Sequence, residues 1–148
     1  MQLFDRDKLQ TLFLFYKKKK GKEHRKHVIK PIPYYFQDSF SSIFFIRGLN
    51  PQVGDVFEYP IVNKARYWIL KMKVDKREKI DIMGRDIEAF RVSAETHFPG
   101  ALKKSGDIFF WFATDAEHRL LKFQGEVKIG SIKGELVSFK RGKKLAPR

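Results

Sequence analysis

The densest group of reactive side chains in this sequence is cationic. Four consecutive lysines occupy positions 17–20, and three further cations follow by position 26. Such clusters bind phosphate and carboxylate groups, either in lipid head groups or in nucleic acids. Two more lysines lie near the C-terminus. The candidate anion-binding residues are therefore Lys17, Lys18, Lys19, Lys20, Lys22, Arg25, Lys26, Lys143 and Lys144.

A second interpretation of the same lysines remains open. Natural β-sheet proteins place lysine on edge strands, where the charge prevents edge-to-edge aggregation. Residues 9–30 predict a hairpin with these lysines at its tip, so the cations could protect a sheet edge instead of binding a ligand.

The sequence carries no catalytic signature. The chain has no cysteine, which excludes a thiol nucleophile, a disulfide framework and a cysteine-ligated metal. His24 and His27 are three residues apart, so on a strand they point to opposite faces. No Gly-x-Ser-x-Gly nucleophile motif occurs. We therefore predict a non-enzymatic protein with no metal site and no cofactor.

Aromatic residues supply the second candidate site. They make up 15% of the chain, with fifteen phenylalanines, and most lie in apolar surroundings that indicate core packing. Among them, Trp68, Phe90 and Trp111 fall in neighbouring predicted strands. We expect these three side chains to line an apolar cleft that takes an apolar ligand.

One helix is predicted near residues 39–47. Asp38 is a good N-cap residue, and Gly48 is placed for a left-handed C-terminal cap. Phe40, Ile43 and Phe44 share one helical face, so we expect them to dock the helix against the open end of a curved sheet.

Alternation with a period of two dominates the rest of the chain. It predicts strands from residue 55 to residue 140, separated by short turns that pair them as an antiparallel meander. The fold class is mainly β, with about seven or eight strands curved into a sandwich or partial barrel plus the short helix. Residues 1–140 form a single domain, and residues 141–148 a flexible basic tail.

Net charge is concentrated at the two ends of the chain. Residues 1–30 carry ten lysines and arginines against three acids, and residues 140–148 carry five and none. The remaining sixteen basic and fourteen acidic residues nearly balance in the middle. This distribution predicts a neutral folded body whose ends face an anionic partner.

Five segments carry a family resemblance through their order and spacing. They are residues 4–7 (Phe-Asp-Arg-Asp), 37–47, 53–60 (opening with Val-Gly-Asp), 111–115 (Trp-Phe-Ala-Thr-Asp) and 127–137. The closing strand pair, with its small-residue turn at Gly130 and Ser131, is the most specific of them. Together they resemble the bacterial domain-of-unknown-function family 3108, over the C-terminal two-thirds of its pattern.

The resemblance implies an exported β-rich domain of the Gram-negative envelope, periplasmic and without established activity. The signal peptide and first strands of the family pattern are absent here. Met1 is then expected to be an internal methionine, whereas a genuine start would make the chain cytoplasmic. The absent strands also predict an open sheet edge that favours a homodimer or a partner chain. No apolar run is long enough for a transmembrane segment.

These observations favour an envelope-associated binding or structural domain that contacts anionic lipid, lipopolysaccharide or an apolar ligand. The alternative is a nucleic-acid-binding module that uses the basic hairpin and the C-terminal tail. A purely structural subunit completed by another chain is the third reading. Exposed aromatic residues beside the cations would favour the nucleic-acid alternative, because bases stack on them.

Overall fold

The computed structural model describes residues 1–19, 21–97, 108–126 and 130–142. Within these ranges the chain forms nine strands in two antiparallel sheets and one helix, which confirms the predicted mainly β class. The predicted basic tail, including Lys143 and Lys144, lies outside the described residues apart from positions 141 and 142.

The first sheet has three strands in the order β1-β2-β3. They are β1 (Gln2–Asp5), β2 (Gln10–Lys19) and β3 (Lys22–Pro31). β2 and β3 form the predicted hairpin, hereafter the basic hairpin, residues 10–31. β1 had no counterpart in the predicted strands, and it pairs with only the first part of β2.

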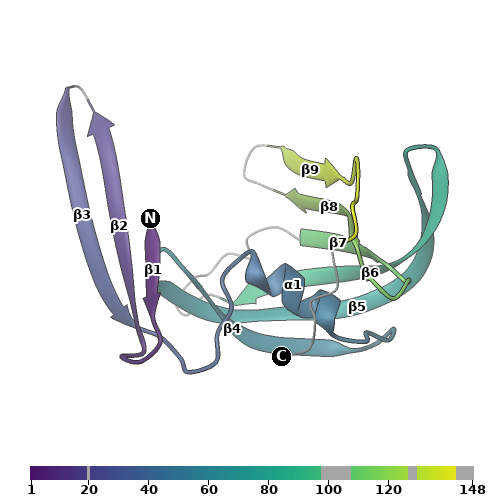
Figure 1. The fold of residues 1–148 in the computed structure, drawn as a ribbon, viewed down its shortest axis with the longest axis horizontal. Coiled ribbons are helices and arrows are strands. Elements are labelled where there is room, and N and C mark those ends of the chain that lie inside the picture. Colours follow the sequence, from purple (N-terminus) through teal and green to yellow (C-terminus); the bar gives the residue numbers. More distant parts are fainter. Residues whose placement is uncertain (20, 98–107, 127–129, 143–148) are drawn as a thin grey trace.

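The second sheet is a six-stranded meander in sequence order. Its strands are β4 (Val56–Asn63), β5 (Arg66–Ile82), β6 (Arg85–His97), β7 (Ile108–Ala113), β8 (Leu120–Glu126) and β9 (Ser131–Glu135). The sheet curves but does not close into a barrel (Figure 1). This agrees with the predicted antiparallel strands curved into a sandwich or partial barrel; β1 is an additional strand, and β1 to β3 form a sheet of their own.

Two apolar cores lie on opposite faces of this sheet. The larger contains Met72, Val74, Val92 and Phe112 together with Ile46 of the helix. The smaller contains Ile82, Ala89, Ala113 and Leu121. β5 contributes to both because its register shifts between Val74 and Lys76, which exchanges the faces of the residues that follow.

The helix α1 (Ser41–Gly48) lies against the concave side of the sheet (Figure 1). Asp38 caps its start as predicted: one carboxylate oxygen accepts hydrogen bonds from the backbone N–H groups of Phe40 and Ser41, at 2.7 and 2.8 Å. The predicted left-handed Gly48 is wrong. Gly48 is the last residue of α1, and Leu49 continues in an extended conformation.

The predicted docking face of α1 is also wrong. Phe40 is 78% exposed and Phe44 65%, whereas Ile46 is 1% exposed and anchors the helix, with Ile43 beside it. The helix carries four consecutive apolar residues, Ile43 to Ile46, so apolar spacing alone did not select the buried side.

A third, smaller core joins the two sheets. Ile32, Phe36 and Val62 are buried there, and Phe4 and Leu9 pack against them. The backbone N–H of Lys64 also donates to the side-chain oxygen of Gln2, at 2.9 Å. This junction holds the base of the basic hairpin while the rest of the hairpin stands away from the curved sheet (Figure 1). No helix in the described ranges has the length and hydrophobicity of a membrane span.

Candidate functional site

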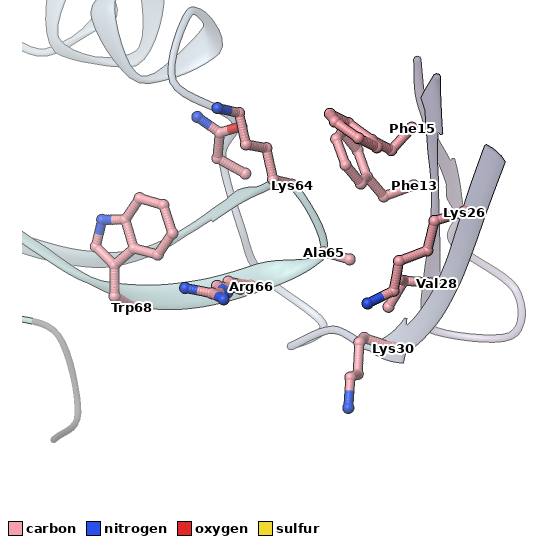
Figure 2. A pocket seen from close by; sticks show the side chains of 10 residues that line it. Phe13, Phe15, Lys26, Val28, Lys30, Lys64, Ala65, Arg66 and Trp68 are labelled. Atoms are coloured by element: carbon pink, nitrogen blue, oxygen red, sulfur yellow. The ribbon is translucent and has the colours of Figure 1, made fainter. Parts of the chain in front are cut away.

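A cleft of about 710 Å³ separates the basic hairpin from the β4–β5 turn (Figure 2). We call it the hairpin cleft. Its size falls within the range of small-molecule sites, roughly 300–1,000 Å³. It is lined by Phe13, Phe15, Lys26, Val28, Lys30, Asn63, Lys64, Ala65, Arg66 and Trp68.

Strand alternation builds the hairpin wall of the cleft. Phe13 pairs with Val28 and Phe15 with Lys26, so all four side chains project from the same face of β2 and β3. Lys30 follows on that face two residues after Val28. Val28 is partly buried, whereas Phe15 remains 44% exposed. The wall therefore offers aromatic surface and two ammonium groups side by side.

The β4–β5 turn forms the opposite wall. Lys64 and Ala65, the two central residues, have positive φ values of 51° and 56°. This tight turn ordinarily uses Asn-Gly because residues with a Cβ are strained at positive φ. The strain is sustained because Ala65 is buried, and the turn presents Lys64 and Arg66 at the cleft. Trp68 lies further along β5 and also packs against the larger core.

Charge in the hairpin cleft has a single sign. The lining residues include Lys26, Lys30, Lys64 and Arg66 and no acid. Figure 2 shows Phe13, Phe15 and Lys26 extending from the hairpin toward the β4–β5 turn, with Lys30 below them, and Arg66 and Trp68 on the β5 side of the cleft. Like charges lining a concave surface reinforce one another, so the cleft attracts anions. Its aromatic and aliphatic surface favours a ligand that is also partly apolar.

The predicted anion-binding residues are spread along the hairpin, and one of them, Lys26, lines the cleft. Lys17 and Lys18 are exposed at the end of β2, and Lys22 begins β3. Lys19 is placed as part of β2, whereas Lys20 lies outside the described residues.

Arg25 lies on the opposite face of the hairpin. It pairs with Glu23 at 3.2 Å and lies over the ring of Tyr16 at 5.9 Å. The phenol of Tyr16 donates to Glu23 at 2.8 Å, and this hydrogen bond to the carboxylate raises the pKa of Tyr16. These contacts occupy Arg25 with neighbours in the same hairpin.

The three residues predicted to form an apolar cleft are divided between the two faces of the sheet, with Trp68 and Phe90 on one face and Trp111 on the other. Trp68 lines the hairpin cleft, and Phe90 is buried in the larger core. Trp111 lies on the other face of the sheet, because it pairs with Arg91 and not with Phe90. Its indole N–H donates to Glu78 at 3.0 Å.

Sequence analysis missed Lys30, Lys64 and Arg66 as site residues. Each is one cation among thirty-one lysines and arginines, and no local run marks it. Only the packing of the two sheets brings the β4–β5 turn, which carries Lys64 and Arg66, to face β3. Among the described residues, no group of three or more histidines and acids is arranged to hold a metal ion.

Comparison with known proteins agrees with the resemblance noted in the sequence. The model of a family described as "Protein of unknown function (DUF3108)" matches residues 4–137. No curated protein and no solved structure matches the chain.

Proposed function

Since this chain belongs to the DUF3108 family of unknown function, we propose that it is an envelope-associated binding domain that holds an anionic amphiphile in the hairpin cleft. The observation that carries the proposal is the composition of the cleft: four cations, no acid, and an aromatic and aliphatic remainder. In this proposal the protein acts in the Gram-negative envelope, the location implied by the family resemblance.

An amphiphile satisfies both parts of the lining. Its head group lies among the cations of the two walls, where a carboxylate or phosphate accepts charge-assisted hydrogen bonds. Its chain covers Phe13, Phe15 and Trp68. Each Å² of apolar surface removed from water contributes about 25 cal/mol, so even a short chain adds several kcal/mol before the ordering costs of binding.

Nucleic acid binding is the competing function for the same cations, and one observation favours it. Phe15 and Tyr16 are 44% and 56% exposed on the basic hairpin, beside Lys17 and Lys18. Base stacking on Tyr16 is disfavoured, because Arg25 already lies over its ring and its hydroxyl is hydrogen-bonded to Glu23. The amphiphile uses more of the cleft lining, and the experiment below includes single-stranded DNA as a probe.

Trp68 provides a direct readout of cleft occupancy. In a Trp111→Phe background, Trp68 is the one remaining tryptophan. Its fluorescence is titrated with dodecyl phosphate below the micellar concentration, with dodecyl maltoside as the uncharged amphiphile and inorganic phosphate as the head group alone. We expect a saturable change with dodecyl phosphate, a weaker response to the maltoside and none at comparable phosphate concentrations.

Two matched double variants test the site. Lys64→Asn with Arg66→Ser removes two cleft charges, and Lys73→Ser with Lys79→Ser removes two exposed charges of β5 outside the cleft. The first is expected to weaken dodecyl phosphate binding about tenfold or more and the second about twofold at most. Equal effects would show general electrostatic attraction and defeat the proposal. Preferential, salt-dependent binding of single-stranded DNA with quenching of the aromatic fluorescence would establish the competing function.

A further inference from the structure

The outer edge of β3 is open along its whole length. β3 is the last strand of its sheet, and in the described ranges no segment pairs with its outer side. Its ten residues exceed the usual strand length of about five or six. A long unpaired edge is a template for another strand. β3 ends at a proline, whose missing N–H ends the row of donors.

The register identifies the free backbone groups. Ile32 donates to the carbonyl of Leu9 at 2.8 Å, in line with the β2–β3 ladder. Bonded and non-bonded pairs alternate in an antiparallel ladder. The N–H and C=O groups that point away from β2 therefore belong to Glu23, Arg25, His27 and Ile29. The β1 side agrees, because Leu14, the partner of His27, directs its own N–H to Met1, at 2.8 Å.

The outer half of the basic hairpin lacks support from the rest of the molecule. β1 pairs with residues 10–13 of β2, so beyond Leu14 the hairpin is a two-stranded ribbon. None of the three apolar cores includes a residue of this ribbon. Two-stranded hairpins are marginally stable in water. A further strand on β3 would convert the ribbon into a three-stranded sheet. Binding of that strand would then be favoured by its own hydrogen bonds and also by the stabilisation of the ribbon.

Charge selects the partner. Lys22, Lys26 and Lys30 are four residues apart and share the cleft-side face of β3. The single acid of β3, Glu23, is bound to Tyr16 and Arg25. A second copy of β3 would place further lysines and arginines against these cations, which is destabilising. The same cations stabilise a strand that carries carboxylates.

We propose that the outer edge of β3 binds an extended acidic segment of another polypeptide by strand addition. The spacing of the lysines gives the expected pattern: an acid at every fourth residue, with an apolar residue between two of them to lie beside Val28. The backbone groups of this edge do not line the hairpin cleft, but Lys26, Val28 and Lys30 belong to both sites, so a bound amphiphile and a bound acidic strand compete for these side chains.

The test uses the full chain and a labelled ten-residue peptide with glutamate at every fourth position and threonine and valine elsewhere. Controls are a peptide of the same composition with its glutamates adjacent and a peptide with lysine in place of glutamate. We expect the patterned peptide to bind at least about tenfold more tightly than either control. We also expect amide exchange at Arg25, His27 and Ile29 to slow on binding, because their outward N–H groups become donors.

His27→Pro removes one outward donor without removing a bond to β2, and His27→Ala is its matched control. The lost hydrogen bond is expected to weaken peptide binding about three- to tenfold in the proline variant alone. Binding that leaves these amides unprotected, or that is the same for the rearranged peptide, would overturn the proposal. So would self-association of the free protein through β3. The Lys64→Asn, Arg66→Ser variant leaves this edge intact, so failure of the cleft and failure of the edge are distinguishable.

Discussion

The ring of Phe123 on β8 lies directly over Gly134, its register partner on β9. A Cβ built at Gly134 would be 2.2 Å from the Cε1 atom of that ring. The aromatic ring thus fills the space that a side chain at residue 134 would occupy. The sequence resemblance had placed this strand pair in its most specific segment, and the contact gives a physical reason why a glycine stands there.

Replacing Gly134 by alanine is therefore expected to be destabilising. The ring or the strand must move, and overpacking of this kind costs about 1–3 kcal/mol. Chemical denaturation measures the change in the free energy of unfolding. Gly125→Ala is the control, because a Cβ at Gly125 meets only Ile108 at an ordinary 3.7 Å. If both variants unfold alike, the contact of Phe123 with Gly134 has no energetic importance.

The docking of α1 predicts opposite outcomes for neighbouring residues. Ile46→Ala is expected to cost about 2–5 kcal/mol, because it leaves a cavity in the larger core. Phe44→Ser is expected to stay within about 0.5 kcal/mol, because that side chain is 65% exposed. Thermal unfolding of the two variants separates these expectations. A reversed order would mean that the helix presents its phenylalanines to the sheet, as the sequence pattern first indicated.

Glu78 gives the stability a dependence on pH. Its hydrogen bonds to Lys76 and Trp111 lower the pKa of its carboxyl group below the ordinary 4.5. A lowered folded-state pKa stabilises the protein above pH 4.5, and this contribution is lost as the pH falls through the folded pKa. Glu78→Gln should reduce the unfolding free energy by about 0.5–1 kcal/mol at neutral pH. The difference from wild type should shrink in acid, and a constant difference would contradict this origin.

The β5–β6 turn contains a residue that strains its backbone. Met83 has a φ of 55° and is followed by Gly84 at 75°. Asparagine tolerates this conformation better than methionine, and Asn-Gly is the favoured pair in such turns. Met83→Asn should raise the unfolding free energy by about 0.5–1 kcal/mol, whereas Met83→Ala should not. Met83 is 71% exposed, so lost packing does not complicate the measurement.

Local patterns predicted the strands well and their three-dimensional assembly poorly. The strands predicted after residue 55 include β5 (Arg66–Ile82), because side chains alternate between two faces regardless of what covers them. The strand at Gln2–Asp5 was missed, since four residues are too few to show a period. The predicted buried face of α1 was wrong, because the four consecutive apolar residues Ile43 to Ile46 point to different sides of the helix.

The candidate site was predicted only in part. Local sequence identified the hairpin cations, and Lys26 is among the cleft residues. It did not identify Arg66, which lines the cleft together with Lys26 and Lys30. Thirty-five residues separate Arg66 from Lys30 in the sequence, so no local pattern connects them. That juxtaposition depends on the small core of Ile32, Phe36 and Val62, which sets how the two sheets meet. The predicted cleft between Trp68 and Trp111 failed because of strand register, which places the two side chains on opposite faces of the sheet.

The irregularity at Asp75 divides β5 between the two apolar cores of the second sheet. Asp75 accepts a hydrogen bond from Ser93 at 3.0 Å and pairs with Arg91 at 3.3 Å, which holds the extra residue in place. The core residues of β5 before Asp75 belong to the larger core, and those of β5 after it belong to the smaller core. We therefore expect the end of β5 around Ile82, which the smaller core covers, to open more readily than the part around Met72 and the helix. Native-state hydrogen exchange would then show two plateaus of protection along a single continuous strand.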